Sequence, residues 1–226
     1  MINQTSEKII SKRKLPIQNN KTNLSFFYLL SKKVMDYVFS ILGLIVLLPL
    51  FIVVAIMIKA EDRKGKILYK QLRCGKDGKL FYMYKFRSMV TNAEDLKIQL
   101  LNQNEATGPV FKIKRDPRVT KVGRFIRKTS IDELPQLLNV LKGEMSLVGP
   151  RPPLPEEVEK YTDYERQRLG VTPGLTCYWQ VSGRSNTSFE RWVELDLKYI
   201  EERNLFIDIK LIFRTFFVLF GSNDAY

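Results

Sequence analysis

The residue types best suited to chemistry in this chain are two neighbouring acids, Asp132 and Glu133, which lie between cationic stretches. Residues 112–128 before them carry eight lysines and arginines against one acid, Asp116, and this run is the expected anion-binding surface. One carboxylate of the pair could attack a phosphorus atom while the other binds Mg²⁺. Alternatively, both acids only begin a helix and interact with its dipole, which is worth roughly 0.3–1 kcal/mol. The residues alone leave both interpretations open.

Three further cations lie in patterns that restrict their side chains. Lys85 and Arg87 alternate along an expected strand, so both lie on one face of it. Arg151 lies between Pro150 and Pro152, whose rings hold its backbone, and a pre-organised guanidinium is suited to binding a phosphate or a base. The alternatives are solvated charges on the strand and a turn whose arginine faces solvent.

Composition limits the chemistry that these residues can perform. The 226 residues are enough for one sizeable domain, and the net charge of +13 favours an anionic partner such as nucleic acid, an anionic membrane or a phosphorylated substrate. Because the chain has no histidine, catalysis must use carboxylates, hydroxyls, amines or thiols, and oxygen ligands favour Mg²⁺ over zinc. Cys74 and Cys177 are far apart in the sequence and indicate neither a zinc site nor a disulfide framework.

The elements expected to position these residues form a mainly helical α+β fold with a small β-hairpin. Two short strands, residues 67–73 and 79–86, flank the turn GKDG. The acid pair begins a helix over residues 132–142 that ends at Gly143, and its start is either a capping box of Ser130 with Glu133 or an N-cap nearer Asp132. A proline-rich loop over residues 149–155 carries Arg151. Further helices are expected over residues 91–102, 156–169 and 190–203.

A long apolar segment precedes the hairpin. From Tyr37 to Ile58 the chain has 22 residues without a charge, which as a helix reach roughly 33 Å and can cross a bilayer. Pro49 interrupts this segment, and basic residues flank both of its ends. Under the positive-inside rule this pattern favours a re-entrant membrane helix over residues 24–60, with both ends on the cytoplasmic face. A kinked span is the open alternative, and a buried core helix is the alternative for a soluble protein.

The two ends of the chain complete the expected domain organisation. Residues 1–23 are polar and basic and indicate a disordered tail. Residues 61–226 are expected to form a helical catalytic domain on the cytoplasmic face. Its last apolar run, residues 205–220, is interrupted by Asp208, Lys210 and Arg214, which is typical of an amphipathic interfacial helix that lies along a membrane.

Three stretches of sequence carry a resemblance to a known family: KFRSM (85–89), KRDPRVTKVGRFIRKTSIDELPQLLNVLKGEMSLVGPRP (114–152) and PGLTCYWQVSGRS (173–185). They resemble the bacterial sugar transferases, a family of polyprenyl-phosphate hexose-1-phosphate transferases, and the resemblance extends over residues 31–226. Within that family the chain is similar to the short, monotopic phosphoglycosyl transferases that initiate exopolysaccharides.

The resemblance implies transfer of a hexose 1-phosphate from a UDP-sugar to polyprenyl (undecaprenyl) phosphate through a phosphosugar–enzyme intermediate, with release of UMP. Asp132 is then the nucleophile and Glu133 the Mg²⁺ ligand. Phosphate charge is neutralised by a lysine and two arginines, and the nucleotide is placed by a Pro-Arg-Pro turn. The matching substrate-binding residues are Lys85, Arg87, Arg127, Pro150, Arg151 and Pro152. The family's membrane helix breaks at a Ser-Pro pair, whereas Leu48 precedes Pro49 here.

The implied reaction starts an exopolysaccharide, capsule or O-antigen repeat unit at the cytoplasmic face of the bacterial inner membrane. The expected partners are the UDP-sugar, polyprenyl phosphate and membrane lipid, with Mg²⁺ as cofactor and without nucleic acid, and a homodimer is left open. Two rival functions are a membrane-tethered glycosyl transferase that releases UDP and a non-enzymatic module that binds anionic lipid or nucleic acid. No motif identifies the sugar, because its hydroxyl groups are recognised by the geometry of the binding pocket.

Overall fold

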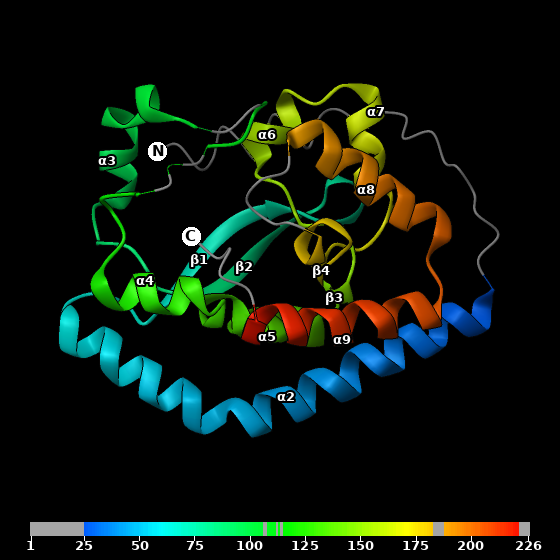
Figure 1. Ribbon diagram of the computed structural model, residues 1–226, viewed down its shortest axis with the longest axis horizontal. Coiled ribbons are helices and arrows are strands. Elements are labelled where there is room, and N and C mark those ends of the chain that lie inside the picture. Colours follow the sequence, from blue (N-terminus) through cyan, green and yellow to red (C-terminus); the bar gives the residue numbers. More distant parts are fainter. Residues whose placement is uncertain (1–24, 106–107, 112, 114, 183–187, 222–226) are drawn as a thin grey trace.

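The computed structural model describes residues 25–105, 108–111, 113, 115–182 and 188–221. The expected basic tail, residues 1–23, lies outside this part of the chain. The helices and strands, in chain order, are α2 (Phe26–Glu61), β1 (Leu68–Cys74), β2 (Leu80–Phe86), α3 (Ala93–Gln99), α4 (Lys121–Lys128), α5 (Leu137–Leu141), β3 (Ser146–Val148), α6 (Pro155–Glu159), α7 (Asp163–Arg166), β4 (Gly174–Thr176), α8 (Phe189–Glu202) and α9 (Leu205–Gly221). Short 3₁₀ turns connect several of them (Figure 1). The expected mainly helical α+β class is confirmed.

The expected hairpin is confirmed in position, and the structure adds its register. Strands β1 and β2 pair antiparallel from Leu68 opposite Phe86 to Cys74 opposite Leu80. Their connection turns through Asp77 and Gly78, both with positive φ, as the GKDG sequence favours. The side chains of Phe81 and Met83 alternate into the main hydrophobic core, where they pack with α5, β3 and α9.

A second sheet, which the sequence patterns did not indicate, is a short parallel pair of β3 and β4. The two backbones approach so closely that only glycine fits at their ends. A Cβ atom on Gly174 would overlap the backbone nitrogen of Gly149, and one on Gly149 would lie 2.6 Å from the carbonyl oxygen of Thr172. This contact fixes the start of the loop that carries Arg151.

Helix α2 bends near its middle, and Figure 1 shows both of its ends rising toward the rest of the molecule. Pro49 lies inside the helix, where it removes one backbone hydrogen bond and its ring pushes away the preceding turn. Within the described residues, α2 alone is long and apolar enough to cross a membrane, and its most apolar stretch is only 11% buried. A core helix of a soluble domain would be mostly covered, so the packing argues against that alternative.

Both halves of α2 are attached to the rest of the protein. In the first half, Lys32 pairs with the fully buried Asp208 of α9 at 2.9 Å, and Asp36 accepts a hydrogen bond from the Leu147 backbone N–H of β3. In the second half, Val54 and Ile58 pack in one cluster with Phe86 and Ile126. The first half of α2 therefore contacts α9 and β3, and its second half packs against Phe86 of β2 and Ile126 of α4.

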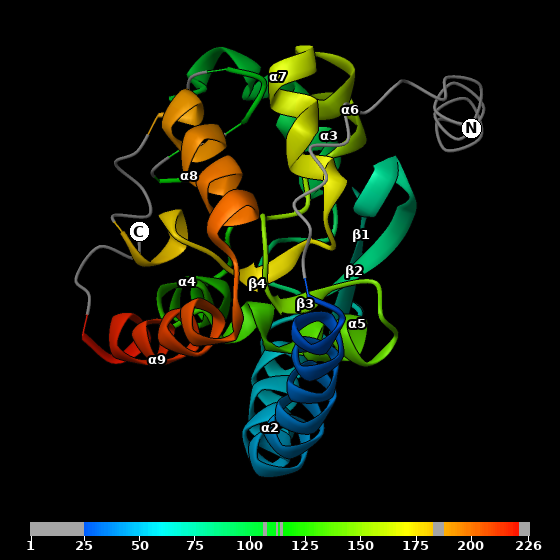
Figure 2. The same cartoon turned by 90° about the vertical axis from the view of Figure 1, so that its right-hand side faces the viewer.

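Three helices lie at one level beside α2, and Figure 2 shows α2 projecting beyond that level. They are α4, α5 and α9, and all three contact α2. Each exposes large apolar side chains, which is unusual for a surface in water. We call these exposed apolar side chains the apolar base: Phe125, Leu138, Phe206, Ile209, Phe213, Phe216 and Phe217.

Two expected helices are interrupted. The helix expected over residues 156–169 is wrong, because α6 ends at Glu159 and Thr162 starts α7 with its own capping box to Glu165. The helix expected over residues 132–142 is a 3₁₀ turn, Ile131–Gln136, followed by the short α5. The helices expected over 91–102, 190–203 and 205–220 are confirmed as α3 with a 3₁₀ turn, α8 and α9.

Candidate active site

The acid pair lies on the tight turn Ile131–Gln136 rather than on an α-helix. Ser130 before it has a left-handed backbone (φ 54°), and its side chain caps no N–H. The expected capping box of Ser130 with Glu133 is therefore wrong. Glu133 instead directs its carboxylate toward cations from two other segments, which argues against a purely helix-capping role.

Glu133 lies between a lysine of β2 and the arginine of the proline-rich loop. Lys85 Nζ donates to its Oε1 at 2.7 Å. Arg151 grips both oxygens, with Nη2 2.7 Å from Oε1 and Nη1 3.3 Å from Oε2. Burial disfavours the charge on Glu133, but Arg151 and Lys85 outweigh it and hold the pKa of this carboxyl well below its usual range. Glu133 is therefore a fixed anion.

Asp132 experiences the opposite balance. Its residue surface is 6% exposed, and burial raises the pKa of the carboxyl to about 6, with Lys85 opposing the shift and the charge of Glu133 adding to it. Among the described residues, no hydrogen bond or ion pair to its carboxylate is formed. At neutral pH, Asp132 is thus an ionised, poorly solvated carboxylate beside three cations, Lys85, Arg127 and Arg151, whose fields reach it.

The loop that carries Arg151 is fixed by the hairpin and by β4. Cys74 N–H donates to the Pro153 carbonyl at 2.9 Å, and Gly174 N–H donates to the Pro150 carbonyl at 2.9 Å. Pro150 and Pro152 are buried, so the prolines pack into the protein while Arg151 between them reaches Glu133. The expected pre-organisation of this arginine is consistent with these contacts.

Arg73 is a member of the site that sequence patterns did not identify. Its Nη1 donates to the Pro152 carbonyl at 3.0 Å, which ties β1 to the loop of Arg151. Burial and the charge of Arg151 together lower the pKa of Arg73 to about 10, against the opposing charges of Glu157 and Glu133. The only sequence signal was a cation at the end of the first expected strand, just before the buried Cys74.

Arg127 and Arg87 lie at the margin of this cluster. Helix α4 approaches Ser88 so closely that a Cβ on Gly123 would overlap the Ser88 carbonyl oxygen, and Arg127 Nε then donates to Ser88 Oγ at 3.0 Å. Arg87 lies one residue beyond β2 and donates from Nε to the Lys66 carbonyl at 2.8 Å. The structure therefore joins Lys85 directly to the acid pair and holds Arg87 toward the end of α2.

The basic run over residues 112–128 does not form one anion-binding surface in the part of it that the structure describes. Arg118 is buried and pairs with Asp116 at 2.6 Å, so its charge is neutralised. Arg127 turns inward to Ser88, whereas Lys121, Arg124 and Lys128 are exposed. Lys112 and Lys114 lie outside the described residues.

The acid pair fits the expected Mg²⁺ by the chemistry of its donors. Within the described ranges no three acidic or cysteine side chains gather around one point, so an ion here would use one or two carboxylates. Mg²⁺ commonly binds in this way, with waters and substrate phosphates completing its six ligands. Glu133 already accepts from two cations, and a carboxylate has about four lone-pair sites, so further coordination is compatible with those bonds.

The hairpin of β1 and β2, the turn Ile131–Gln136 and the loop after β3 thus bring one buried, ionised carboxylate, one fixed carboxylate and a set of cations together. Such a set can hold a phosphate group by charge and present an oxygen anion to its phosphorus atom.

Comparison with known proteins identifies relatives of this chain. The family model described as "Bacterial sugar transferase" matches residues 27–222. The chain is 47% identical over 203 residues to "Galactosyl transferase CpsE" of Streptococcus agalactiae, which covers 88% of this chain and 44% of that protein. It is 44% identical over 220 residues to "Undecaprenyl-phosphate galactose phosphotransferase" of Salmonella typhimurium, which covers 94% of this chain and 44% of that protein.

A third relative is similar along most of its own length. "Exopolysaccharide production protein ExoY" of Sinorhizobium fredii is 39% identical over 201 residues, which covers 87% of this chain and 88% of that protein. The chain spans less than half the length of the first two relatives and most of the third. The match of the family model over nearly the whole chain, together with these identities, confirms the resemblance carried by the three sequence stretches: the chain belongs to the bacterial sugar transferase family.

Proposed function

We propose that the chain transfers a hexose 1-phosphate from a UDP-sugar to polyprenyl phosphate and so initiates an exopolysaccharide, capsule or O-antigen repeat unit. The observation that carries the proposal is the buried carboxylate of Asp132 beside Glu133, which Lys85 and Arg151 hold in place. The names of two relatives, an undecaprenyl-phosphate galactose phosphotransferase and an exopolysaccharide production protein, support the substrate class.

The reaction proceeds in two displacements at one phosphorus atom. An Asp132 oxygen forms a bond to the phosphorus that carries the sugar, and the bond from that phosphorus to the oxygen of the UMP phosphate breaks. A phosphate oxygen of the polyprenyl acceptor then attacks the same phosphorus, and the Asp132 carboxylate leaves and is restored. Lys85, Arg87, Arg127 and Arg151 neutralise the phosphate charge that would otherwise repel the carboxylate.

Two further assignments belong to this proposal. Glu133 would hold Mg²⁺, which when bound neutralises charge on the diphosphate. Pro150 and Pro152 keep Arg151 directed toward the nucleotide phosphates.

The membrane arrangement that accords best with this reaction is monotopic. Residues 24–60 enter and leave the cytoplasmic face of the inner membrane, and residues 61–226 form the catalytic domain on that face. The bend of α2 and the exposed apolar base at the level of α4, α5 and α9 support this arrangement, because both place apolar surface on one side of the molecule (Figure 2). A kinked span would carry the first half of α2 away from α9, against the Lys32–Asp208 pair.

A by-product assay separates this function from its rivals. The purified protein is incubated with Mg²⁺, polyprenyl phosphate and each of a panel of UDP-sugars, and released nucleotides are resolved by chromatography. UMP is expected with one or a few of these sugars. UDP would instead identify a glycosyl transferase that moves the sugar without its phosphate, and no nucleotide with any sugar would favour a binding module.

A further inference from the structure

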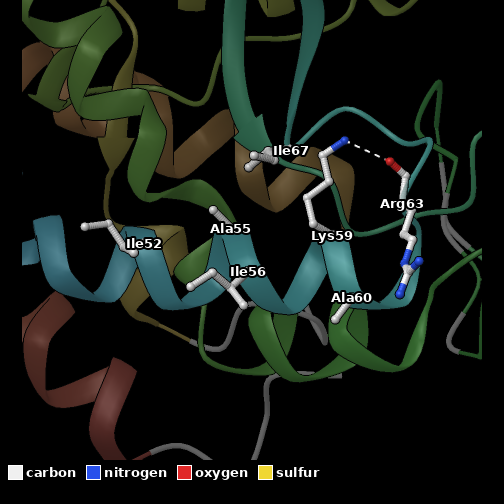
Figure 3. Close-up of a pocket in the computed structure, with 7 residues that line it drawn as sticks. All are labelled: Ile52, Ala55, Ile56, Lys59, Ala60, Arg63 and Ile67. Carbon is white, nitrogen blue, oxygen red and sulfur yellow. Dashed lines mark hydrogen bonds between the residues drawn. The ribbon is translucent and has the colours of Figure 1, made fainter.

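A groove runs along the second half of α2, away from the acid pair. It has a volume of about 600 Å³, within the range of 300–1,000 Å³ that is typical of ligand sites. Figure 3 shows four apolar residues along α2, with Ile67 opposite them on the segment that follows the helix. The lining residues are Ile52, Ala55, Ile56, Lys59, Ala60, Arg63 and Ile67.

The groove has an apolar wall and a cationic end. Lys59 Nζ is held near the end of the helix by the Arg63 carbonyl at 3.0 Å, and both side chains are exposed. Ile52, Ala55 and Ile56 precede these cations in the chain, so that the charge lies where the helix leaves its apolar stretch. An apolar wall with cations at one end complements a molecule that has a hydrocarbon chain and an anionic head.

One residue of the groove wall, Ile67, contacts the segments that carry the candidate active site. The Ile67 carbonyl accepts a hydrogen bond from the Arg87 backbone N–H at 2.8 Å. The Ile67 side chain packs in the same cluster as Phe86 and Ile131, which directly follow Lys85 and precede Asp132 in the chain. A molecule in the groove would therefore contact a residue that is bonded to, and packed against, the segments that carry the site.

We propose that this groove binds the polyprenyl phosphate acceptor, with its first isoprene units against Ile52, Ala55 and Ile56 and its phosphate drawn to Lys59 and Arg63. This inference rests on the proposed function and adds the place where the acceptor enters. The contacts of Ile67 with Arg87, Phe86 and Ile131 favour the acceptor over a bulk phospholipid, since a lipid that only anchors the protein needs no site beside the segments that carry Lys85 and Asp132.

Kinetics with matched variants tests the proposal. Ala55→Trp fills the groove, and Arg63→Ala removes a cation; the respective controls are Val53→Trp, an exposed position on the same half of α2, and Lys64→Ala, an exposed neighbouring cation. Each groove variant should raise the KM for polyprenyl phosphate about tenfold, as loss of a charged or packed contact predicts. The KM for the UDP-sugar should stay unchanged in all four variants. Unchanged acceptor KM in both groove variants would overturn the proposal.

Crosslinking gives a second readout that does not require turnover. An isoprenyl phosphate with a photoreactive group near its phosphate is irradiated with the wild-type protein in phosphatidylglycerol vesicles, and labelled peptides are mapped by mass spectrometry. Labelling within residues 52–67 that unlabelled polyprenyl phosphate displaces supports the proposal. Labelling elsewhere, or equal displacement by added phosphatidylglycerol, contradicts it. If the wild type transfers no phosphosugar, the proposed function fails, and the crosslink still decides what the groove binds.

Discussion

At the scale of single residues, the pKa values of two adjacent carboxylates are shifted in opposite directions because their surroundings differ. Glu133 is stabilised as an anion by Arg151 and Lys85, against the effect of burial. Burial raises the pKa of Asp132 to about 6, and the negative charge of Glu133 adds to this shift. A carboxylate that is charged but poorly solvated is a stronger nucleophile than one in water, whereas a carboxylate paired with two cations is a better positioning group.

The first prediction concerns pH. Because only ionised Asp132 can attack phosphorus, the rate of the UMP burst should rise with pH and reach half of its maximum near pH 6, the pKa of this carboxyl. Glu133→Gln removes the neighbouring negative charge and should move the midpoint to lower pH. A burst that is independent of pH between 5 and 8, measured by rapid quench, would contradict the assignment.

The second prediction concerns stability. The pKa of Asp132 is raised from 3.8 to about 6, so its protonated form stabilises the fold at low pH, and this contribution is lost as the pH rises through 6. At pH 8 the buried charge costs on the order of 3 kcal/mol. Asp132→Asn should therefore raise the melting temperature at pH 8 and leave it nearly unchanged at pH 4. Thermal unfolding in nanodiscs at both pH values tests this, and a lower melting temperature at pH 8 is the opposing result.

The third prediction concerns the planar fork of Arg151. Arg151→Lys keeps the charge but replaces the two-bond contact with Glu133 by a single one, so turnover should fall about tenfold to a hundredfold. Arg191→Lys is the matched control, because Arg191 pairs with Glu194 on the exposed surface of α8. Full activity of Arg151→Lys would show that the bidentate contact is dispensable.

At the scale of elements, sequence periodicity predicted the hairpin, α8 and α9, since each has a regular apolar pattern and a clear boundary. It did not predict the interruption between α6 and α7. The signal was present, because Thr162 and Glu165 form a capping box that starts a new helix. The charged pattern over residues 156–169 continued across that start and concealed it.

The turn that carries the acid pair shows a different limit. Pro135 lacks an N–H and cannot continue an α-helical ladder of hydrogen bonds. The turn begins at Ser130, whose left-handed backbone conformation is one that residues other than glycine rarely adopt. The carboxylate of Glu133 pairs with Lys85 and Arg151 instead of forming the expected capping box with Ser130. Such contacts between distant segments have no local signature, so the sequence predicted the pair but not its geometry.

The fourth prediction concerns the topology of α2. If the helix is re-entrant, Ser31→Cys and Lys64→Cys, both at exposed positions on its two flanks, should react with an impermeant thiol reagent from the same side of sealed vesicles. Background labelling should be low, since Cys74 and Cys177 are buried. Pro49→Ala should straighten the helix and favour a full span. Reaction of the two cysteines from opposite sides would establish a kinked span.

At the scale of the whole molecule, the exposed apolar surfaces and the charged cluster lie in different parts of the structure. The bent α2 and the apolar base lie on one side, and the cluster around Glu133 is built by the hairpin and the loop after β3 (Figures 1 and 2). Sequence analysis identified most members of that cluster because acids, cations and prolines stand out in composition. It missed Arg73, whose role arises only when β1 meets the Pro152 carbonyl.

The net charge of +13 has a meaning at this scale as well. Both the membrane surface and the two proposed substrates are anionic. A basic protein is therefore attracted to the membrane surface and in turn attracts both substrates. The charge by itself did not separate this function from nucleic-acid binding. The arrangement of cations around two carboxylates does favour phosphate chemistry, because a surface that only binds a nucleic-acid backbone needs cations and no buried carboxylate.

The most direct test of the central claim is to locate the sugar phosphate on the protein. Wild-type protein is incubated with UDP-sugar and Mg²⁺ in the absence of polyprenyl phosphate, quenched in acid and analysed as peptides by mass spectrometry. UMP release and a hexose-phosphate adduct on Asp132 are expected, with no adduct in Asp132→Asn and a slower one in Glu133→Gln. An adduct on Glu133, or UMP release that strictly requires the lipid acceptor, would contradict a mechanism in which Asp132 is the nucleophile.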